Sequence, residues 1–93
     1  MKITKGLISR SEAEKISTDY VAFVEGNFDL FEKVYAKFEK LKRGQAVITC
    51  HDGKFIRVKV SSISPGFEGE PVVRVSNGEW SWRVDGDGYA FPV

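Results

Sequence analysis

The segment from Pro71 to Val84 contains the dipeptide Asn77-Gly78 between two runs of alternating apolar and polar residues. A type I′ hairpin turn needs two residues that tolerate positive φ, and Asn-Gly meets this need well. A two-residue turn predicts the strand pairs Ser76–Glu79, Val75–Trp80, Arg74–Ser81 and Val73–Trp82. The chain is therefore expected to contain an antiparallel hairpin around which the remaining elements are organised.

Successive side chains on a strand point to opposite faces, so this pairing places nearly all apolar residues of the hairpin on one face and nearly all polar residues on the other. One face collects apolar residues: Val73, Val75, Trp80, Trp82 and Val84. The other collects mostly polar residues: Val72, Arg74, Ser76, Glu79, Ser81 and Arg83. The apolar face is expected to belong to a core, which makes the two tryptophans packing residues in preference to ligand-stacking ones.

Residues 45–50 and 54–63 also alternate with period two, on either side of His51-Asp52-Gly53. A two-residue Asp-Gly turn would place Ile48 opposite Arg57 and mix apolar with charged side chains on one face. A type I turn with a left-handed, bulged Gly53 places Ile48 opposite Ile56 instead. We therefore predict the bulged turn. Its inward face is formed by Ala46, Ile48, Cys50, Ile56, Val58 and Val60, and its outward face by Val47, Thr49, Phe55, Arg57, Lys59 and Ser61.

Two amphipathic helices are predicted before these strands. Ser9 and Glu12 form a capping box for a helix over residues 10–25, which Gly26 ends. A second helix is predicted over residues 28–43, because apolar residues recur there at helical spacing. Its buried stripe consists of Phe31, Val34, Tyr35, Phe38 and Leu41.

The start of the second helix is assigned to Asn27 or Asp29, and Asp29 with Glu32 offers a capping box. Gly44 is its expected end, after two cations in the last turn that suit the helix dipole. Beyond Gly44 the apolar period changes from helical spacing to two, which marks the boundary between helices and strands.

The predicted strands cover residues 45–50, 54–63, 71–76, 79–84 and 89–93. A tight turn at Asp85–Gly88 is expected to place Val84 opposite Tyr89, so that the last strand continues the meander. The fold class is α+β, with two N-terminal helices and a five-strand antiparallel meander in a single domain of residues 1–93. Two arrangements remain open: a strongly curved sheet closing on the helices, and a small SH3-like barrel.

A chain of 93 residues is long enough to bury one core without disulfide or metal support. A net charge of +1 indicates no bulk attraction to nucleic acid or to an acidic membrane, although a local basic patch remains compatible with it. The single cysteine, and the lack of an export signal or a long apolar stretch, favour a cytoplasmic protein without a membrane contact.

No catalytic constellation emerges from the sequence, and we expect no enzyme activity. His51 lies in the predicted turn and Cys50 is its neighbour on the strand, so their side chains point to opposite faces and do not easily form a nucleophile–base pair. Asp85-Gly86-Asp87-Gly88 resembles the start of a calcium loop, yet the further oxygen ligands are missing and a tight turn explains the same residues. No cofactor and no metal site is predicted.

Three groups of residues are candidates for binding. The outward sheet face combines cations with an aromatic ring, as a phosphate backbone and an unstacked base require: Phe55, Arg57, Lys59, Arg74 and Arg83. The second helix carries a lysine stripe at i, i+4 and i+7: Lys33, Lys37 and Lys40. Phe67, in the loop of residues 62–70, either anchors a protein partner or folds down onto the core.

The sequence thus favours a non-enzymatic binding module, with a protein-interaction module (an adaptor or an inhibitor of another protein) ahead of the alternative. That alternative is binding of single-stranded or structured nucleic acid through the basic outer sheet face. The chain is expected to be a monomer, or a homodimer joined through an open edge strand.

Overall fold

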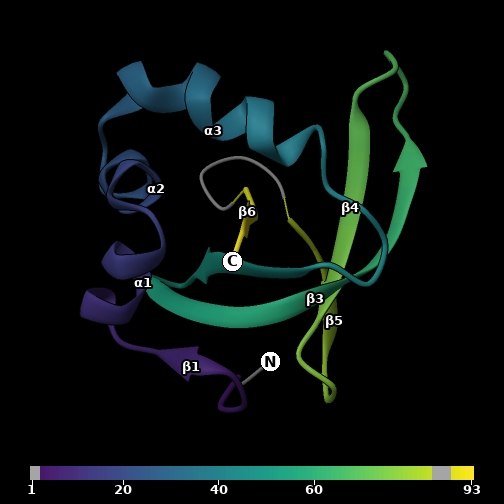
Figure 1. The fold of residues 1–93 in the computed structure, drawn as a ribbon. Helices are drawn as coiled ribbons and strands as arrows, with labels where there is room; N and C mark the ends of the chain where they lie inside the picture. Colours follow the sequence, from purple (N-terminus) through teal and green to yellow (C-terminus); the bar gives the residue numbers. More distant parts are fainter. Residues whose placement is uncertain (1–2, 85–88) are drawn as a thin grey trace.

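The structure is a computed structural model that describes residues 3–84 and 89–93. In chain order its elements are β1 (Leu7–Ile8), α1 (Arg10–Ile16), α2 (Thr18–Val24), the 3₁₀ helix η1 (Phe28–Leu30), α3 (Phe31–Phe38), β2 (Ala46–His51), β3 (Lys54–Pro65), β4 (Pro71–Ser76), β5 (Ser81–Val84) and β6 (Phe91–Pro92). The helices lie beside an antiparallel sheet (Figure 1), so the predicted α+β class is confirmed.

The six strands form one sheet in the order β5-β4-β3-β2-β6, and β1 pairs with β3. The long strand β3 curves strongly, so that β4 and β5 stand at a steep angle to the β2–β3 hairpin (Figure 1). No pairing joins β5 to β6 among the strands of residues 3–84 and 89–93, so the sheet is curved but open. The alternative of a closed SH3-like barrel is not confirmed.

The last strand does not continue the meander. We predicted that it would pair with residues 79–84, but β6 pairs with β2 through Val47–Pro92 and Ile48–Phe91. This position places the Phe91 ring 5.6 Å from the buried Tyr20 ring, and so covers apolar surface that pairing with β5 would leave open. The predicted turn at residues 85–88 lies outside the described residues.

The predicted bulged turn between β2 and β3 is also wrong. The strands are joined by a two-residue turn, in which Asp52 (φ 52°) and Gly53 (φ 75°) both take the positive φ that a type I′ turn requires. Ile48 is therefore opposite Arg57, the pairing that we rejected. We had assumed that one face of this hairpin is exposed to solvent, whereas Val47 and Ile48 are both fully buried on opposite faces.

The β2–β3 hairpin is the middle layer between two cores. The first, which we call the valine core, lies under β4 and β5 and comprises Ile3, Phe38, Leu41, Val47, Ile56, Val58, Val60, Val73, Val75, Val84 and Ala90. The second, the helix core, lies under the helices and comprises Ala13, Tyr20, Val21, Phe23, Val34, Ile48 and Phe55. Helix α3 joins them, because Val34 packs in the helix core and Phe38 in the valine core.

The β4–β5 hairpin forms as predicted but in a different register. Val75 pairs with Trp82 and Ser76 with Ser81, so the connection is a four-residue loop instead of a two-residue turn. A shift by two residues preserves the faces, and Trp82 accordingly packs against the valine core. Trp80 instead leaves the strand and is 43% exposed.

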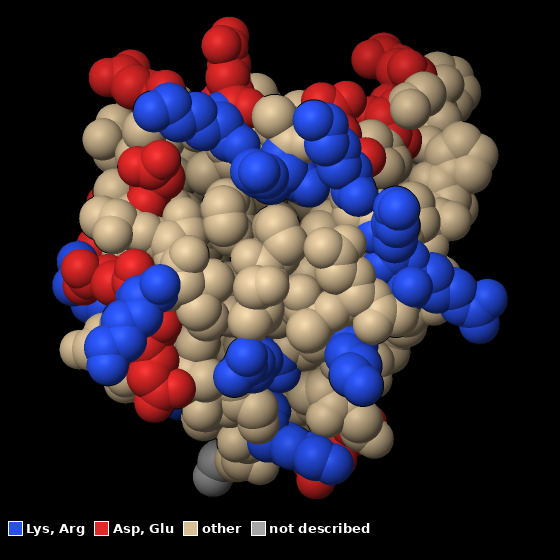
Figure 2. Space-filling view, viewed as in Figure 1, with Lys and Arg blue, Asp and Glu red and all other residues tan. Residues whose placement is uncertain are grey.

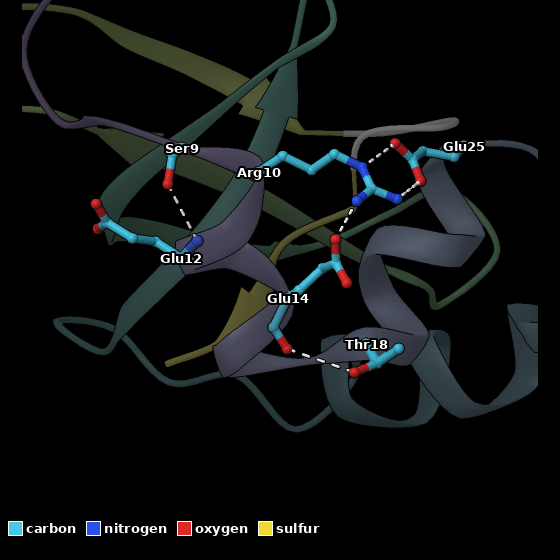
Figure 3. Close-up of polar contacts among 6 residues, drawn as sticks. All are labelled: Ser9, Arg10, Glu12, Glu14, Thr18 and Glu25. Atoms are coloured by element: carbon cyan, nitrogen blue, oxygen red, sulfur yellow. Dashed lines mark hydrogen bonds and ion pairs between the residues drawn. The ribbon is translucent and has the colours of Figure 1, made fainter.

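The first predicted helix is two short helices that meet at Ser17. Ser17 has extended backbone (φ −159°, ψ 113°), and its hydroxyl accepts a hydrogen bond from the Tyr20 amide as the N-cap of α2. A serine that caps one helix cannot continue the preceding one, and this explains the break. The predicted cap at Ser9 is confirmed by its hydrogen bond from the Glu12 amide (Figure 3).

An ion pair holds the two short helices together. The Arg10 guanidinium donates to both carboxylate oxygens of Glu25, each at 2.6 Å, and also contacts Glu14 (Figure 3). These hydrogen bonds lower the pKa of the Glu25 carboxyl and raise the pKa of Arg10. The pair links the first residue of α1 to the C-cap of α2.

The second predicted helix is shorter than residues 28–43. A 3₁₀ turn at Phe28–Leu30 precedes α3, which ends at Phe38. Neither Asn27 nor Asp29 caps α3; its N-cap is Leu30, which provides no side-chain hydrogen bond. Leu41 nevertheless reaches the valine core, because the chain turns after α3 and leads directly into β2.

Candidate binding surfaces

The four cations of the predicted basic face lie on one side of the sheet. Arg57 and Lys59 are two residues apart on β3, and Lys59 pairs with Ser76 on β4. Arg74, two residues before Ser76, pairs with Arg83 on β5. All four cations are exposed. A bulge in β3 between Val60 and Ser62 lets the polar side continue past Ser61, since Ser62 pairs with Arg74.

The aromatic member of that predicted face is not available for binding. Phe55 is only 6% exposed and packs in the helix core, with its ring 6.3 Å from that of Tyr20. Thr49, which we placed on the same outward face, is fully buried. Phe55 is buried because the helices cover its face of the β2–β3 hairpin (Figure 1). Thr49 lies on the other face, where it pairs with Ile56 of the valine core.

A groove of about 450 Å³ opens beside Arg57 and Lys59. Its lining comes from the N-terminal segment, the β2–β3 hairpin and the β4–β5 loop: Lys5, Ala46, Arg57, Val58, Lys59, Ser76, Asn77 and Gly78. Three of these residues are cations and none is acidic. Neither Lys5, Arg57 nor Lys59 forms an ion pair with a carboxylate of the described residues. We name this site the basic groove.

Asn77 holds the basic groove together. Its side-chain Nδ2 donates to the carbonyl of Lys5 at 3.1 Å, and its Oδ1 accepts from the amides of Glu79 (2.9 Å) and Trp80 (2.7 Å). The side chain is buried, with 9% of the residue exposed. One amide group therefore shapes the β4–β5 loop and also attaches the N-terminal segment to it.

Gly6 fixes the same segment from its other side. The Arg57 amide donates to the Gly6 carbonyl at 2.7 Å, and Gly6 has a φ of +88°. A Cβ atom at this position would lie 2.5 Å from the Arg57 carbonyl oxygen, so only glycine permits the close approach of the two backbones. Lys5 thus reaches the groove through contacts between residues far apart in sequence, and no local pattern could have identified it.

The predicted loop candidate, Phe67, lies at the tip of the β3–β4 connection. It is fully exposed (101%), so it does not fold onto the core. The loop is closed by hydrogen bonds from the Gly66 amide to the Glu70 carbonyl (2.6 Å) and from the Gly69 amide to the Gly66 carbonyl (3.2 Å). The tip of the β3–β4 connection projects from one end of the sheet (Figure 1), and the exposed Phe67 ring is in contact with solvent.

The predicted lysine stripe is exposed along α3 and the turn after it. Lys33 and Lys37 lie on α3, whereas Lys40 follows its end at Phe38. Figure 2 shows positively charged side chains along this edge, interspersed with acidic ones. Helix α3 lies across the end of the molecule opposite the β4–β5 loop, so the lysine stripe is separated from the basic groove (Figure 1).

A smaller cavity of about 240 Å³ lies where α3 meets β4 and β5. Its floor is aromatic and its rim carries one charge of each sign, with the lining formed by Tyr35, Phe38, Glu70, Pro71, Val72, Arg83, Val84 and Tyr89. The Tyr89 ring is 4.9 Å from that of Phe38 and belongs to both cores. The cavity is therefore a gap at the junction of the two cores.

The groups with catalytic potential are separated by the strand on which they lie. Cys50 packs against the helix core, whereas the His51 ring lies 5.8 Å from Trp82 on the opposite face. His51 Nε2 is 3.5 Å from an Asp52 carboxylate oxygen. Within the described part of the chain, no group of three His, Cys, Asp or Glu side chains lies close enough to hold a metal ion.

Comparison of the chain with protein-family models, curated proteins and solved structures finds no match to any of them. Among residues 3–84 and 89–93, no helix combines the length and the apolar character needed to cross a bilayer. Function must therefore be argued from the surfaces described above.

Proposed function

We propose that this protein is a non-enzymatic, cytoplasmic binding module that engages a protein partner through the Phe67 tip. The observation that carries the proposal is the full exposure of a phenylalanine on a loop closed by its own hydrogen bonds. Phenylalanine is costly to expose to water, and aromatic residues that enter a partner's pocket contribute much of the binding energy of protein interfaces.

The loop around Phe67 favours a defined contact. The Glu70 carboxylate accepts a hydrogen bond from the Glu68 amide at 3.0 Å, and the Gly66–Glu70 contact leaves no room for a side chain at Gly66. A loop constrained in this way loses less conformational entropy on binding than a free one. The expected partner presents an apolar pocket with a basic rim that complements Glu68 and Glu70.

Partner capture with two matched variants tests this proposal. Immobilised wild-type protein, Phe67→Ser and Phe28→Ser are compared as baits; Phe28 is also an exposed phenylalanine (64%) but lies on η1. A partner should bind the wild type and Phe28→Ser alike, and bind Phe67→Ser about thirtyfold more weakly, as expected for a central contact of about 2 kcal/mol. Proteins that bind all three baits equally would rule out the Phe67 tip as the interface.

A second candidate function, nucleic-acid binding, is favoured by the basic sheet face. The strand registers bring Arg57, Lys59, Arg74 and Arg83 to one side, next to the basic groove. Binding of this kind should weaken steeply as salt is raised, because neutralised phosphates release counterions. A titration with a labelled oligonucleotide at low and at physiological salt tests it, and a lack of binding at low salt would eliminate it.

A further inference from the structure

The basic groove concentrates positive charge, and no carboxylate belongs to its lining among residues 3–84 and 89–93. Lys5 comes from the N-terminal segment, while Arg57 and Lys59 come from β3, so separate parts of the chain are folded to place three cations around one opening. Like charges held together repel one another, and a bound anion relieves that repulsion. The groove is therefore suited to an anionic ligand.

Hydrogen bonds of Asn77 organise the groove before any ligand is present. Asn77 fixes the Lys5 backbone and the amides of Glu79 and Trp80, and the Gly6–Arg57 hydrogen bond holds the next residue of the N-terminal segment. Only the lysine and arginine side chains then need to be ordered on binding. Preorganisation of this kind reduces the entropic cost of association.

Two neighbouring features indicate a polymer in preference to a single phosphate. On the same side of the sheet, Lys59 is followed across β4 and β5 by Arg74 and Arg83, so cations continue beyond the groove. Trp80 belongs to the loop that forms one wall and is 43% exposed, with its backbone fixed by Asn77. A track of cations suits the phosphodiester backbone of a single strand, and an exposed aromatic ring in the adjoining loop is available to stack on a base.

We propose that the basic groove binds a phosphodiester of a single-stranded nucleic acid, with Trp80 stacking on an adjacent base. This inference rests on the second candidate function and assigns it a site that includes Lys5, Asn77 and Trp80. It also separates the nucleic-acid surface from the Phe67 tip, which lies at the opposite end of β4 from the β4–β5 loop (Figure 1).

The test is a fluorescence-anisotropy titration of a fluorescein-labelled oligothymidylate over a series of salt concentrations. The double variant Lys5→Gln/Lys59→Gln should weaken binding at low salt. It should also flatten the plot of log K against log salt by roughly 1.4, because each lost phosphate contact on a single strand removes about 0.7. Both lysines are exposed, so thermal unfolding of the variant should match that of the wild type.

The matched control is Lys33→Gln/Lys37→Gln, which removes the same charge from α3. It should leave the affinity and the salt slope near the wild-type values. If both double variants weaken binding equally, net charge explains the effect and the groove assignment is overturned, while nucleic-acid binding itself stands. If the wild type does not bind at low salt, both the groove assignment and the second candidate function are overturned.

Two further measurements distinguish a nucleic acid from an acidic peptide as the ligand. Trp80→Ala should weaken oligothymidylate binding roughly tenfold, since stacking on one base contributes on that order. A labelled polyglutamate of equal charge should bind much more weakly, because it offers no base to stack. Equal, groove-dependent binding of polyglutamate would overturn the nucleic-acid assignment in favour of an acidic peptide, and an unchanged affinity of Trp80→Ala would overturn the stacking role.

Discussion

Two hairpins of this protein contain nearly the same turn dipeptide, Asp52-Gly53 and Asn77-Gly78, and close their strands differently. Asp52 and Gly53 both have positive φ and join β2 to β3 directly. At the second hairpin only Gly78 has positive φ (95°), and four residues separate β4 from β5. We predicted instead a bulged turn at the first hairpin and a two-residue turn at the second.

The difference lies in what each side chain contacts. The β2–β3 turn is set by backbone conformation, and its register is enforced by two cores that bury both faces of the hairpin. The Asn77 loop is set by a side chain that bonds to its own loop and to Lys5, 72 residues away. A turn dipeptide therefore predicts that a hairpin forms, but packing and distant hydrogen bonds decide its length.

The largest effect is expected for Gly6→Ala. This substitution displaces the N-terminal segment, to which Asn77 of the β4–β5 loop is hydrogen-bonded. The new methyl group would clash with the Arg57 carbonyl and occupy an unfavourable positive φ. The expected loss is roughly 3 kcal/mol in the free energy of unfolding, measured in urea. The matched control is Gly44→Ala, where φ is +85° but no atom of the described residues lies within 4 Å of the added methyl group. An equal loss for both variants would show that the close backbone approach at Gly6 is not needed.

Next in size is Asn77→Ala, which removes three hydrogen bonds from a buried position. It should lower the unfolding free energy by roughly 1–3 kcal/mol, because the freed donor and acceptors remain partly shielded from water. Asn77→Asp keeps the acceptor for Glu79 and Trp80 and should lose less. Asp52→Ala at the other turn should lose about 1 kcal/mol, because alanine tolerates the positive φ less well than aspartate and the contact with His51 is removed. If Asn77→Ala and Asp52→Ala proved equally destabilising, the distinction between the two turns would be lost.

The sequence predicts most of the strands, because their faces depend only on parity. The bounds of β4 match residues 71–76, and Val73, Val75, Trp82 and Val84 lie on one face although the register differs by two. Strand alternation gives the wrong exposure for Phe55. It assumes that one face of the strand is exposed to solvent, whereas the helices cover the face on which Phe55 lies. The pairing of β6 with β2 could not be predicted either, because alternation does not distinguish the β2 edge of the sheet from the β5 edge.

For the candidate site, strand alternation identifies Arg57, Lys59, Arg74 and Arg83, which the structure places on one side. Lys5 is missed, because it precedes any periodic segment and reaches the groove only through Asn77 and Gly6. The exposure of Phe67 could not be decided from the sequence either, since a loop phenylalanine is equally able to cover a core. The candidate site therefore combines cations that strand alternation identifies with a lysine that only long-range contacts bring to the groove.

The glycines of the two turns provide a finer comparison. Gly53→Ala introduces strain at φ +75° in open space and should cost roughly 1–2 kcal/mol. Gly78→Ala introduces similar strain at φ +95°, and its methyl group would lie 3.2 Å from the Lys5 ammonium, which is flexible enough to move. Urea unfolding should thus give similar losses, whereas the displaced lysine should weaken oligothymidylate binding only in Gly78→Ala. A much larger loss for Gly78→Ala would mean that Lys5 is held rigidly.

The smallest expected effect is that of Asp52→Gly, and Asn77→Gly places glycine at the matching position of the other turn. Asp52→Gly removes the strain of a positive φ but frees the unfolded chain, and the two terms should cancel to within about 0.5 kcal/mol. Asn77→Gly gains nothing from backbone freedom, since Asn77 has no positive φ, and loses its three hydrogen bonds; roughly 1–3 kcal/mol should be lost. Paired thermal and urea unfolding of the two variants measures this difference. A neutral Asn77→Gly would show that the backbone alone determines both turns, and that the Asn77 side chain is not what holds Lys5 at the basic groove.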